Sequence, residues 1–128
     1  MNDDALTILV IEDEDFISSL VARSLKEEGY NVIITSDFKS SLIVLDTEAI
    51  DLVISDVMLP YTGGLDIVEY IREHKNISAT PVILATGMDT DVLQASNIRA
   101  NAILSKPFEM IDLIDKVNEM LGKTAEGV

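Results

Sequence analysis

Five short runs rich in apolar residues limit the folds that this sequence can adopt. Most positions within each run are apolar, without the regular alternation of polar and apolar residues found in half-buried strands. Runs of this kind are typical of strands covered on both faces, as in parallel sheets. The runs occupy residues 6–11, 31–35, 52–56, 81–87 and 102–106.

The segments between the runs carry apolar residues at helical spacing, which predicts amphipathic helices. Strands that alternate with helices of this length indicate βαβ units with right-handed crossovers. We therefore expect an α/β fold: a flavodoxin-like, doubly wound, five-stranded parallel sheet of strand order 2-1-3-4-5 with five helices. The 128 residues suit a single domain, with a core at about residues 6–121 and a loose tail over residues 122–128.

Composition excludes several classes of function. Nine basic residues against 23 acidic ones give a net charge of -14, which disfavours direct binding to nucleic acid or to anionic membranes. The absence of cysteine excludes disulfides and thiolate metal sites. The apolar runs are too short to span a bilayer, and the acidic start differs from a secretory signal. A cytoplasmic protein is the expectation.

Polar side chains follow the expected strands at their carboxyl ends. Glu12 and Asp13 come after the first strand, Asp56 ends the third, Thr86 the fourth and Lys106 the fifth. In a doubly wound sheet these ends open onto one edge, and the expected order places the first and third strands side by side. The five residues are therefore expected to share one crevice.

Each residue also has a simpler explanation. Asp56 can cap a turn, Glu12 and Asp13 can be acids favoured at the start of a helix, Thr86 can be a strand former and Lys106 an exposed surface residue. The coincidence of all five at strand ends favours a shared site.

A site of this composition suits a hard cation and a phosphoryl group. Crowded carboxylates repel one another unless a cation is present, and ligands that offer only oxygen indicate a hard ion such as Mg²⁺. Lys106 supplies a positive charge for an anion and Thr86 a hydroxyl group. Together these groups suit phosphoryl transfer to a carboxylate.

These residues resemble the receiver domain of bacterial two-component response regulators, over nearly the whole chain. The motifs that carry the resemblance are Glu12-Asp13, Asp56-Val57-Met58-Leu59-Pro60 with Gly64, Thr86-Gly87, and Lys106-Pro107-Phe108.

The resemblance implies that Asp56 accepts a phosphoryl group from a phosphohistidine on a sensor histidine kinase or a histidine phosphotransfer protein. It implies Mg²⁺ bound by Asp13, Asp56 and the backbone carbonyl of Met58, with Glu12 acting through water. On this view the chain is a signalling phosphoprotein and not an enzyme on other substrates, since it promotes only its own phosphorylation and slow dephosphorylation.

The resemblance also implies how the signal is passed on. Lys106 would pair with the phosphoryl oxygens, and Thr86 would move to hydrogen-bond one of them, changing contacts with a downstream protein or effector domain. The Lys106-Pro107 bond would be cis, at a cost of about 0.5–1 kcal/mol for a proline. The chain would be either a stand-alone receiver or part of a longer regulator.

Several positions depart from the family pattern. Ile103 stands where an aromatic switch residue is common, and Asn101-Ala102 replaces an acidic pair associated with a charged activation dimer. We therefore expect a monomer or weak dimer. Met58 and Met88 stand at positions that guide the hydrolytic water in the family, which predicts slow self-dephosphorylation.

Surface expectations are less direct. Small residues at Ser18, Ser19 and Ala22 are expected on the outer face of the first helix, where a phosphodonor helix can dock. Four apolar residues fall off the expected core faces and suggest partial burial or a self-association patch. They are Ile43, Val44, Ile67 and Ile111.

Two other functions compete with the phosphoacceptor. A phosphate-independent protein-binding module would keep the fold without using the polar set. A haloacid-dehalogenase-type phosphatase would use Asp13 as the nucleophile and Asp15 as acid-base, but leaves Asp56, Pro60 and Gly64 unexplained. A flavin carrier is disfavoured, because acids rather than a phosphate-binding loop follow the first strand.

Overall fold

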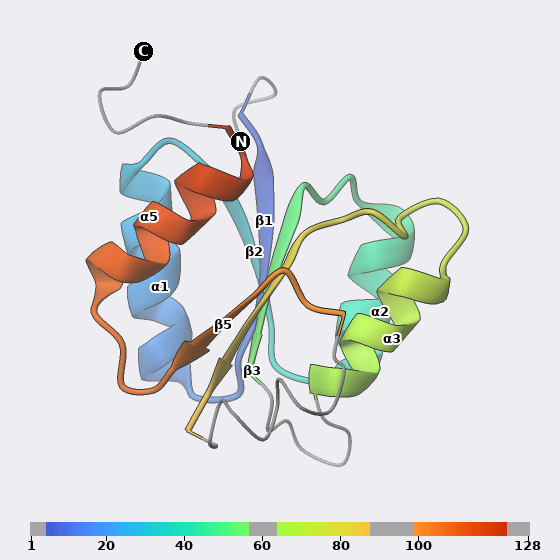
Figure 1. Ribbon diagram of the computed structural model, residues 1–128, viewed down its shortest axis with the longest axis horizontal. Coiled ribbons are helices and arrows are strands. Elements are labelled where there is room, and N and C mark those ends of the chain that lie inside the picture. The colour runs from blue at the N-terminus through green and yellow to red at the C-terminus, as the bar shows by residue number, and fades with distance from the viewer. Residues whose placement is uncertain (1–4, 57–63, 88–98, 123–128) are drawn as a thin grey trace.

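A parallel sheet lies between two layers of helices in the computed structural model, which describes residues 5–56, 64–87 and 99–122 (Figure 1). The strand order is β2-β1-β3-β4-β5, and every neighbouring pair is parallel. The strands are β1 (Thr7–Ile11), β2 (Asn31–Thr35), β3 (Leu52–Asp56), β4 (Val82–Thr86) and β5 (Ala102–Ser105). The predicted fold class and strand order are confirmed.

Within the described residues, two helices cover each face of the sheet. Helices α1 (Asp15–Glu27) and α5 (Met110–Met120) lie on one side, and α2 (Phe38–Thr47) and α3 (Gly64–Glu73) lie on the other (Figure 1). The remaining helix of the predicted five falls on residues 88–98, outside the described residues. Among the helices that the structure describes, none has the length and apolar character needed to cross a membrane.

In the part of the chain that the structure describes, the core consists of two clusters, one on each face of the sheet. Strand residues alternate between them: Ile8 and Val10 pack toward α1 and α5, whereas Leu9 and Ile11 pack toward α2 and α3. Strands β3 and β4 are buried at every position, as expected for the centre of a sheet covered on both faces.

The buried stripe of α1 differs from the prediction. Ser18 and Ala22, predicted on the outer face, are buried together with Val21 and Leu25, while Leu20, predicted inward, is 45% exposed. Positions 18, 21, 22 and 25 are themselves a regular helical stripe, and small residues allow the helix to approach the sheet closely. The prediction placed the larger side chains in the core and therefore misassigned part of the buried face of α1.

The other surface expectations are partly right. Ile67, predicted off the core, is fully buried in α3, and Val44 packs against the core as a partly buried residue. Ile43 and Ile111 are exposed at 58% and 66%.

Hydrogen bonds close the amino ends of the strands. Asp51 lies just before β3, and its Oδ2 accepts from the backbone N–H of Thr7 at 2.7 Å, while its own N–H donates to the Thr7 carbonyl at 2.8 Å. Asn101, just before β5, makes the same reciprocal pair with Val82, at 2.8 Å in both directions. In each case a residue that precedes one strand forms two hydrogen bonds with the first residue of the neighbouring strand.

Arg72, at the end of α3, completes this closed end. Its guanidinium donates to Asn101 Oδ1 at 2.7 Å and to the carbonyls of Thr80, Arg99 and Ser78 at 2.6, 2.9 and 3.2 Å. Burial, followed by repulsion from Arg99, lowers the pKa of Arg72 from its ordinary value.

Candidate functional site

The register of β1 and β3 brings two acids together at the carboxyl edge of the sheet. Ile11 lies opposite Ser55, so the next residue on each strand, Glu12 and Asp56, are neighbours. The Glu12 N–H donates to the Thr35 carbonyl at 3.0 Å, which continues the ladder with β2 beyond the end of β1. Glu12 and Asp56 are only 5% and 8% exposed, whereas Asp13, one residue further from the sheet, is exposed.

Lys106 directly follows the edge strand β5, and its side chain reaches the same two acids. Its backbone N–H donates to the Thr86 carbonyl at 2.6 Å and so extends the pairing of β5 with β4. Its Nζ lies 2.9 Å from Asp56 Oδ2 and 2.9 Å from Glu12 Oε1, so one ammonium group bridges both buried carboxylates. The Lys106-Pro107 peptide bond is cis, as the resemblance implied.

The electrostatics of this cluster follow from burial and pairing. Burial raises the pKa of Glu12 above its ordinary value, although hydrogen bonds from Lys106 and from the Glu14 backbone N–H oppose this rise. Burial alone would lower the pKa of Lys106, but its hydrogen bonds to Asp56 and Glu12 outweigh burial and raise it. The lysine is therefore held in its charged form at neutral pH.

The acids form a set that fits a divalent cation. One carboxylate oxygen from each of Glu12, Asp13 and Asp56 lies within 4.8 Å of the others. Asp13 faces solvent, whereas Glu12 and Asp56 face the lysine, so three carboxylates converge on a place where only one cationic side chain is described. An oxygen-only set with an open side suits Mg²⁺.

Two other residues singled out in the sequence lie within the described part of the chain, and two do not. Thr86 is fully buried at the end of β4, one position beyond Ala85, which pairs with Asp56 across the ladder. Met58, the predicted carbonyl ligand, lies outside the described residues, as does Met88. Ile103 is partly buried and packs against the core cluster beneath α2 and α3.

Sequence reasoning missed an apolar hollow beside the lysine. A cavity of about 350 Å³ lies between α1 and the segment that follows β5. Leu20 of α1 and the exposed side of Lys106-Pro107-Phe108 contribute to its lining, and Phe16, on the same helix, is 81% exposed. The available signal in the sequence was a pair of large apolar residues four positions apart on this helix, Phe16 and Leu20, but the helical pattern had assigned Leu20 to the core.

Comparison with known proteins gives a consistent result. The family model described as response regulator receiver domain matches residues 8–118. The regulatory protein VanR of Enterococcus faecium is 39% identical over 116 residues, which cover 89% of this chain and 49% of VanR. The chain spans about half the length of the curated relatives that it matches.

Solved structures agree with the sequence relatives. The response regulator protein TrrA from Thermotoga maritima, solved in complex with Mg(2+)-BeF, is 30% identical with a TM-score of 0.80, over 90% of this chain and 98% of TrrA. A CheY-like response regulator receiver domain protein from Methanospirillum hungatei is 26% identical with a TM-score of 0.84, over 93% of this chain and 95% of that one.

Proposed function

The chain belongs to the response regulator receiver domain family, and we propose that it is a phosphoacceptor that takes a phosphoryl group from a phosphohistidine onto Asp56. The observation that supports this most strongly is the position of Lys106, whose Nζ lies 2.9 Å from both Asp56 and Glu12 at the carboxyl edge of the sheet. A lysine held there is placed to meet phosphoryl oxygens as well as the acceptor carboxylate.

The proposed step forms one bond and breaks one bond. A carboxylate oxygen of Asp56 attacks phosphorus, the P–N bond to the donor imidazole breaks, and its electron pair returns to the ring nitrogen. The product is an acyl phosphate on Asp56 and a histidine that takes up a proton from solvent. Lys106 balances the negative charge of the transferring group, because its raised pKa keeps it protonated.

The acid cluster supports a magnesium requirement. Glu12, Asp13 and Asp56 supply the converging oxygens, with Glu12 acting through water and the Met58 carbonyl as the further proposed ligand. When bound, Mg²⁺ would neutralise the surplus of carboxylates and the charge of the phosphoryl oxygens. The Mg(2+)-BeF complex of TrrA is consistent with such a site.

The phosphodonor surface is proposed at the apolar hollow beside Lys106. Leu20 is 45% exposed in its wall, and a donor helix packed there would bring a histidine close to the lysine and Asp56. This replaces the expected docking on Ser18, Ser19 and Ala22, because Ser18 and Ala22 are buried and only Ser19 is exposed. A histidine kinase or phosphotransfer protein is the proposed donor, with a downstream protein or effector domain as the receiver of the signal.

The organisation and location of the protein remain proposals. We propose one receiver domain over residues 1–128, acting in the cytoplasm as a monomer or weak dimer. Signalling through Thr86 is likewise proposed: its complete burial at the end of β4 would require the segment after it to adjust when the hydroxyl turns toward a phosphoryl group.

The test is intact-mass spectrometry after incubation with phosphoramidate or a phosphorylated histidine donor, with and without Mg²⁺. The expected result is a single phosphoryl adduct that requires Mg²⁺ and is lost in Asp56→Asn. Asp66→Asn, in the first turn of α3, serves as the matched control and should leave the adduct in place.

The alternatives give different results. No adduct with either donor would replace this proposal with a phosphate-independent binding module. Labelling at Asp13 instead of Asp56, found by peptide mapping, would favour the phosphatase alternative.

A further inference from the structure

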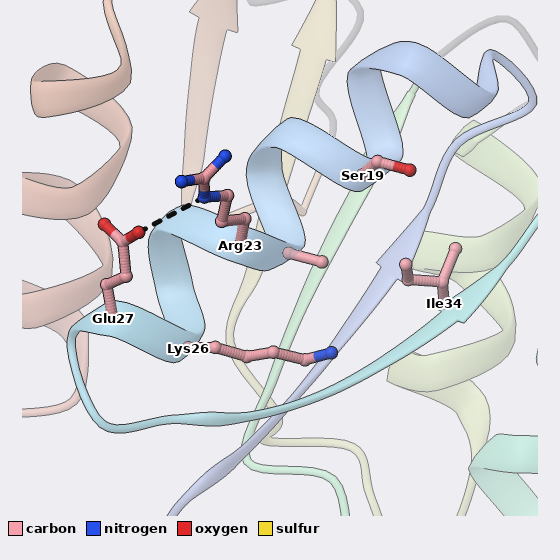
Figure 2. Close-up of a pocket in the computed structure, with 6 residues that line it drawn as sticks. Ser19, Arg23, Lys26, Glu27 and Ile34 are labelled. Carbon is pink, nitrogen blue, oxygen red and sulfur yellow. Dashed lines mark hydrogen bonds and ion pairs between the residues drawn. The ribbon is translucent and has the colours of Figure 1, made fainter.

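An open groove between α1 and the edge strand β2 uses none of the residues of the acid site. It has a volume of about 500 Å³ and is lined by Ser19, Ala22, Arg23, Lys26, Glu27 and Ile34. Figure 2 shows the Ile34 side chain in this groove, with Lys26 extending from α1 toward the strands. We call this feature the β2 groove.

A second hollow continues the β2 groove along the same strand. It has a volume of about 330 Å³ and is lined by Lys26, Tyr30, Asn31 and Val32. Because Lys26 lines both, the two hollows adjoin, and together they follow β2 from Val32 to Ile34. The two hollows together therefore run along part of β2.

The backbone of β2 is open on this side. β2 is the first strand in the sheet order and pairs with β1 alone among the described strands. The Asn31 N–H donates to Leu6 and the Thr35 carbonyl accepts from Glu12, so residues 31, 33 and 35 direct their backbone groups at β1. In a parallel ladder the alternate residues, Val32 and Ile34, direct theirs away from it. Their N–H and C=O groups form an edge that another strand can pair with.

The charge of the groove is opposite to that of the protein. The chain carries a net charge of -14, yet two of its nine basic residues, Arg23 and Lys26, line this groove. Glu27 is paired with Arg23 at 3.3 Å, while Lys26 forms no ion pair within the part of the chain that the structure describes (Figure 2). With Arg23, Lys26 and Glu27 in its lining, the groove carries two positive charges and one negative charge, in contrast to the strongly acidic chain as a whole.

We propose that the β2 groove binds an extended acidic peptide segment of a partner protein, which adds to the sheet as a sixth strand beside β2. The peptide backbone pairs with Val32 and Ile34. An apolar side chain packs over Ile34, which is 43% exposed, and an acidic side chain two residues away on the same face meets Lys26.

A second copy of this chain is the competing occupant. Two copies paired through β2 would bring two highly acidic molecules together and would leave both Lys26 side chains without an anion. Complementary charge therefore favours an acidic peptide.

The test uses a synthetic peptide, acetyl-Thr-Glu-Thr-Val-Thr-Glu-Thr-amide, which presents glutamate, valine and glutamate on one face when extended. Amide chemical shifts of the ¹⁵N-labelled full chain are followed by NMR during titration. We expect saturable shifts at Val32 and Ile34, and a dissociation constant weakened at least about fivefold by Lys26→Glu. Lys75→Glu, an exposed lysine beyond α3, is the matched control and should leave binding unchanged.

Two further arms separate backbone pairing from charge. A peptide with lysine in place of both glutamates tests charge, and one with N-methylated amides tests pairing; both should bind at least about fivefold more weakly. The Asp56→Asn variant should bind the acidic peptide as the wild type does, because this surface does not depend on phosphorylation.

Three results would overturn the proposal. The first is the absence of saturable shifts at Val32 and Ile34 up to about 5 mM peptide. The second is equal binding of the acidic and basic peptides. The third is a concentration-dependent dimer in sedimentation that is broken by Ile34→Lys and unaffected by Lys26→Glu, which would assign the groove to a second copy.

Discussion

Polar side chains line both ends of the sheet, but the two ends differ in how well their donors, acceptors and charges are matched. At the amino ends, Asp51 and Asn101 exchange hydrogen bonds with the backbone of neighbouring strands, and Arg72 donates to four oxygens. At the carboxyl ends, the described residues bring three carboxylates toward one lysine. The comparison indicates that matched donors and acceptors hold a fold together, whereas a surplus of one charge prepares a place for a ligand.

Removing the lysine is the strongest way to break the carboxyl end. Lys106→Met is expected to slow phosphorylation of Asp56 at least about a hundredfold, because a preorganised donor to the transferring group is lost. The rate is measured by quenched-flow transfer from a phosphorylated histidine donor. Lys75→Met, which is exposed, should leave the rate unchanged. An unaltered rate in Lys106→Met would show that the 2.9 Å contacts are structural only.

Replacing Arg72 tests the amino end of the sheet, where we expect an effect on stability and none on phosphorylation. Arg72→Ala should lower the free energy of unfolding by about 2 kcal/mol, because the partly buried Thr80 carbonyl and three more exposed oxygens lose their donor. Phosphorylation of the folded variant should stay normal. Urea denaturation gives the stability, and Arg23→Ala, which breaks an ion pair between highly exposed side chains, should cost less than about 0.5 kcal/mol. A variant with intact stability and lost phosphorylation would reverse the comparison.

A further property of the carboxyl end is the rate at which the proposed acyl phosphate on Asp56 is lost. Polar replacements at both methionines, Met58→Asn with Met88→Lys, are expected to speed loss of the acyl phosphate about tenfold, by guiding a water to phosphorus. Decay of the intact-mass adduct measures this. Met120→Gln, on α5, is the matched control for added polarity. Unchanged decay in the double variant would contradict the prediction that the two methionines make dephosphorylation slow.

The smallest expected effect is the pH dependence of stability at Glu12. Because burial raises its pKa above 4.5, the folded protein binds the proton more tightly than the unfolded chain. The stability from this group is therefore complete below pH 4.5 and is lost as pH rises through the folded pKa. In metal-free buffer, the free energy of unfolding of Glu12→Gln relative to wild type should increase from pH 4.5 to neutrality.

Repeating the pH series with Mg²⁺ tests whether the effect comes from Glu12 in the acid cluster. A cation at the acid cluster favours the charged form of Glu12, so the trend should weaken when Mg²⁺ is added. Equal slopes for the variant and the wild type in metal-free buffer would contradict the assignment. Lys106 does not interfere, since its raised pKa keeps it charged throughout this range.

The strands and the acid site were predictable because both depend on short local patterns. Each run of apolar residues ends where the chain must leave the sheet, so the residue after it is placed by the strand itself. Glu12, Asp56 and Lys106 were found in this way, and the structure brings their side chains within hydrogen-bonding distance. No long-range information was needed beyond the strand order.

The rotation of α1 could not be predicted from the same patterns. Both the stripe through Leu20 and the stripe through Ser18 and Ala22 have helical spacing, and the choice depends on how closely the helix approaches the sheet. The hydrogen bonds of Arg72 were equally hidden, because its partners are backbone carbonyls, which carry no sequence signal. Contacts to backbone and the depth of packing are properties of the assembled molecule.

The bridge made by Lys106 has a consequence for the time at which the protein becomes competent. The lysine is 94 positions from Glu12 and 50 from Asp56 along the chain. During synthesis both acids therefore leave the ribosome long before their cation, and a partly made chain has no complete site. The proposed acceptor site is therefore complete only after β5 has been made, and a chain that lacks β5 is expected not to accept a phosphoryl group.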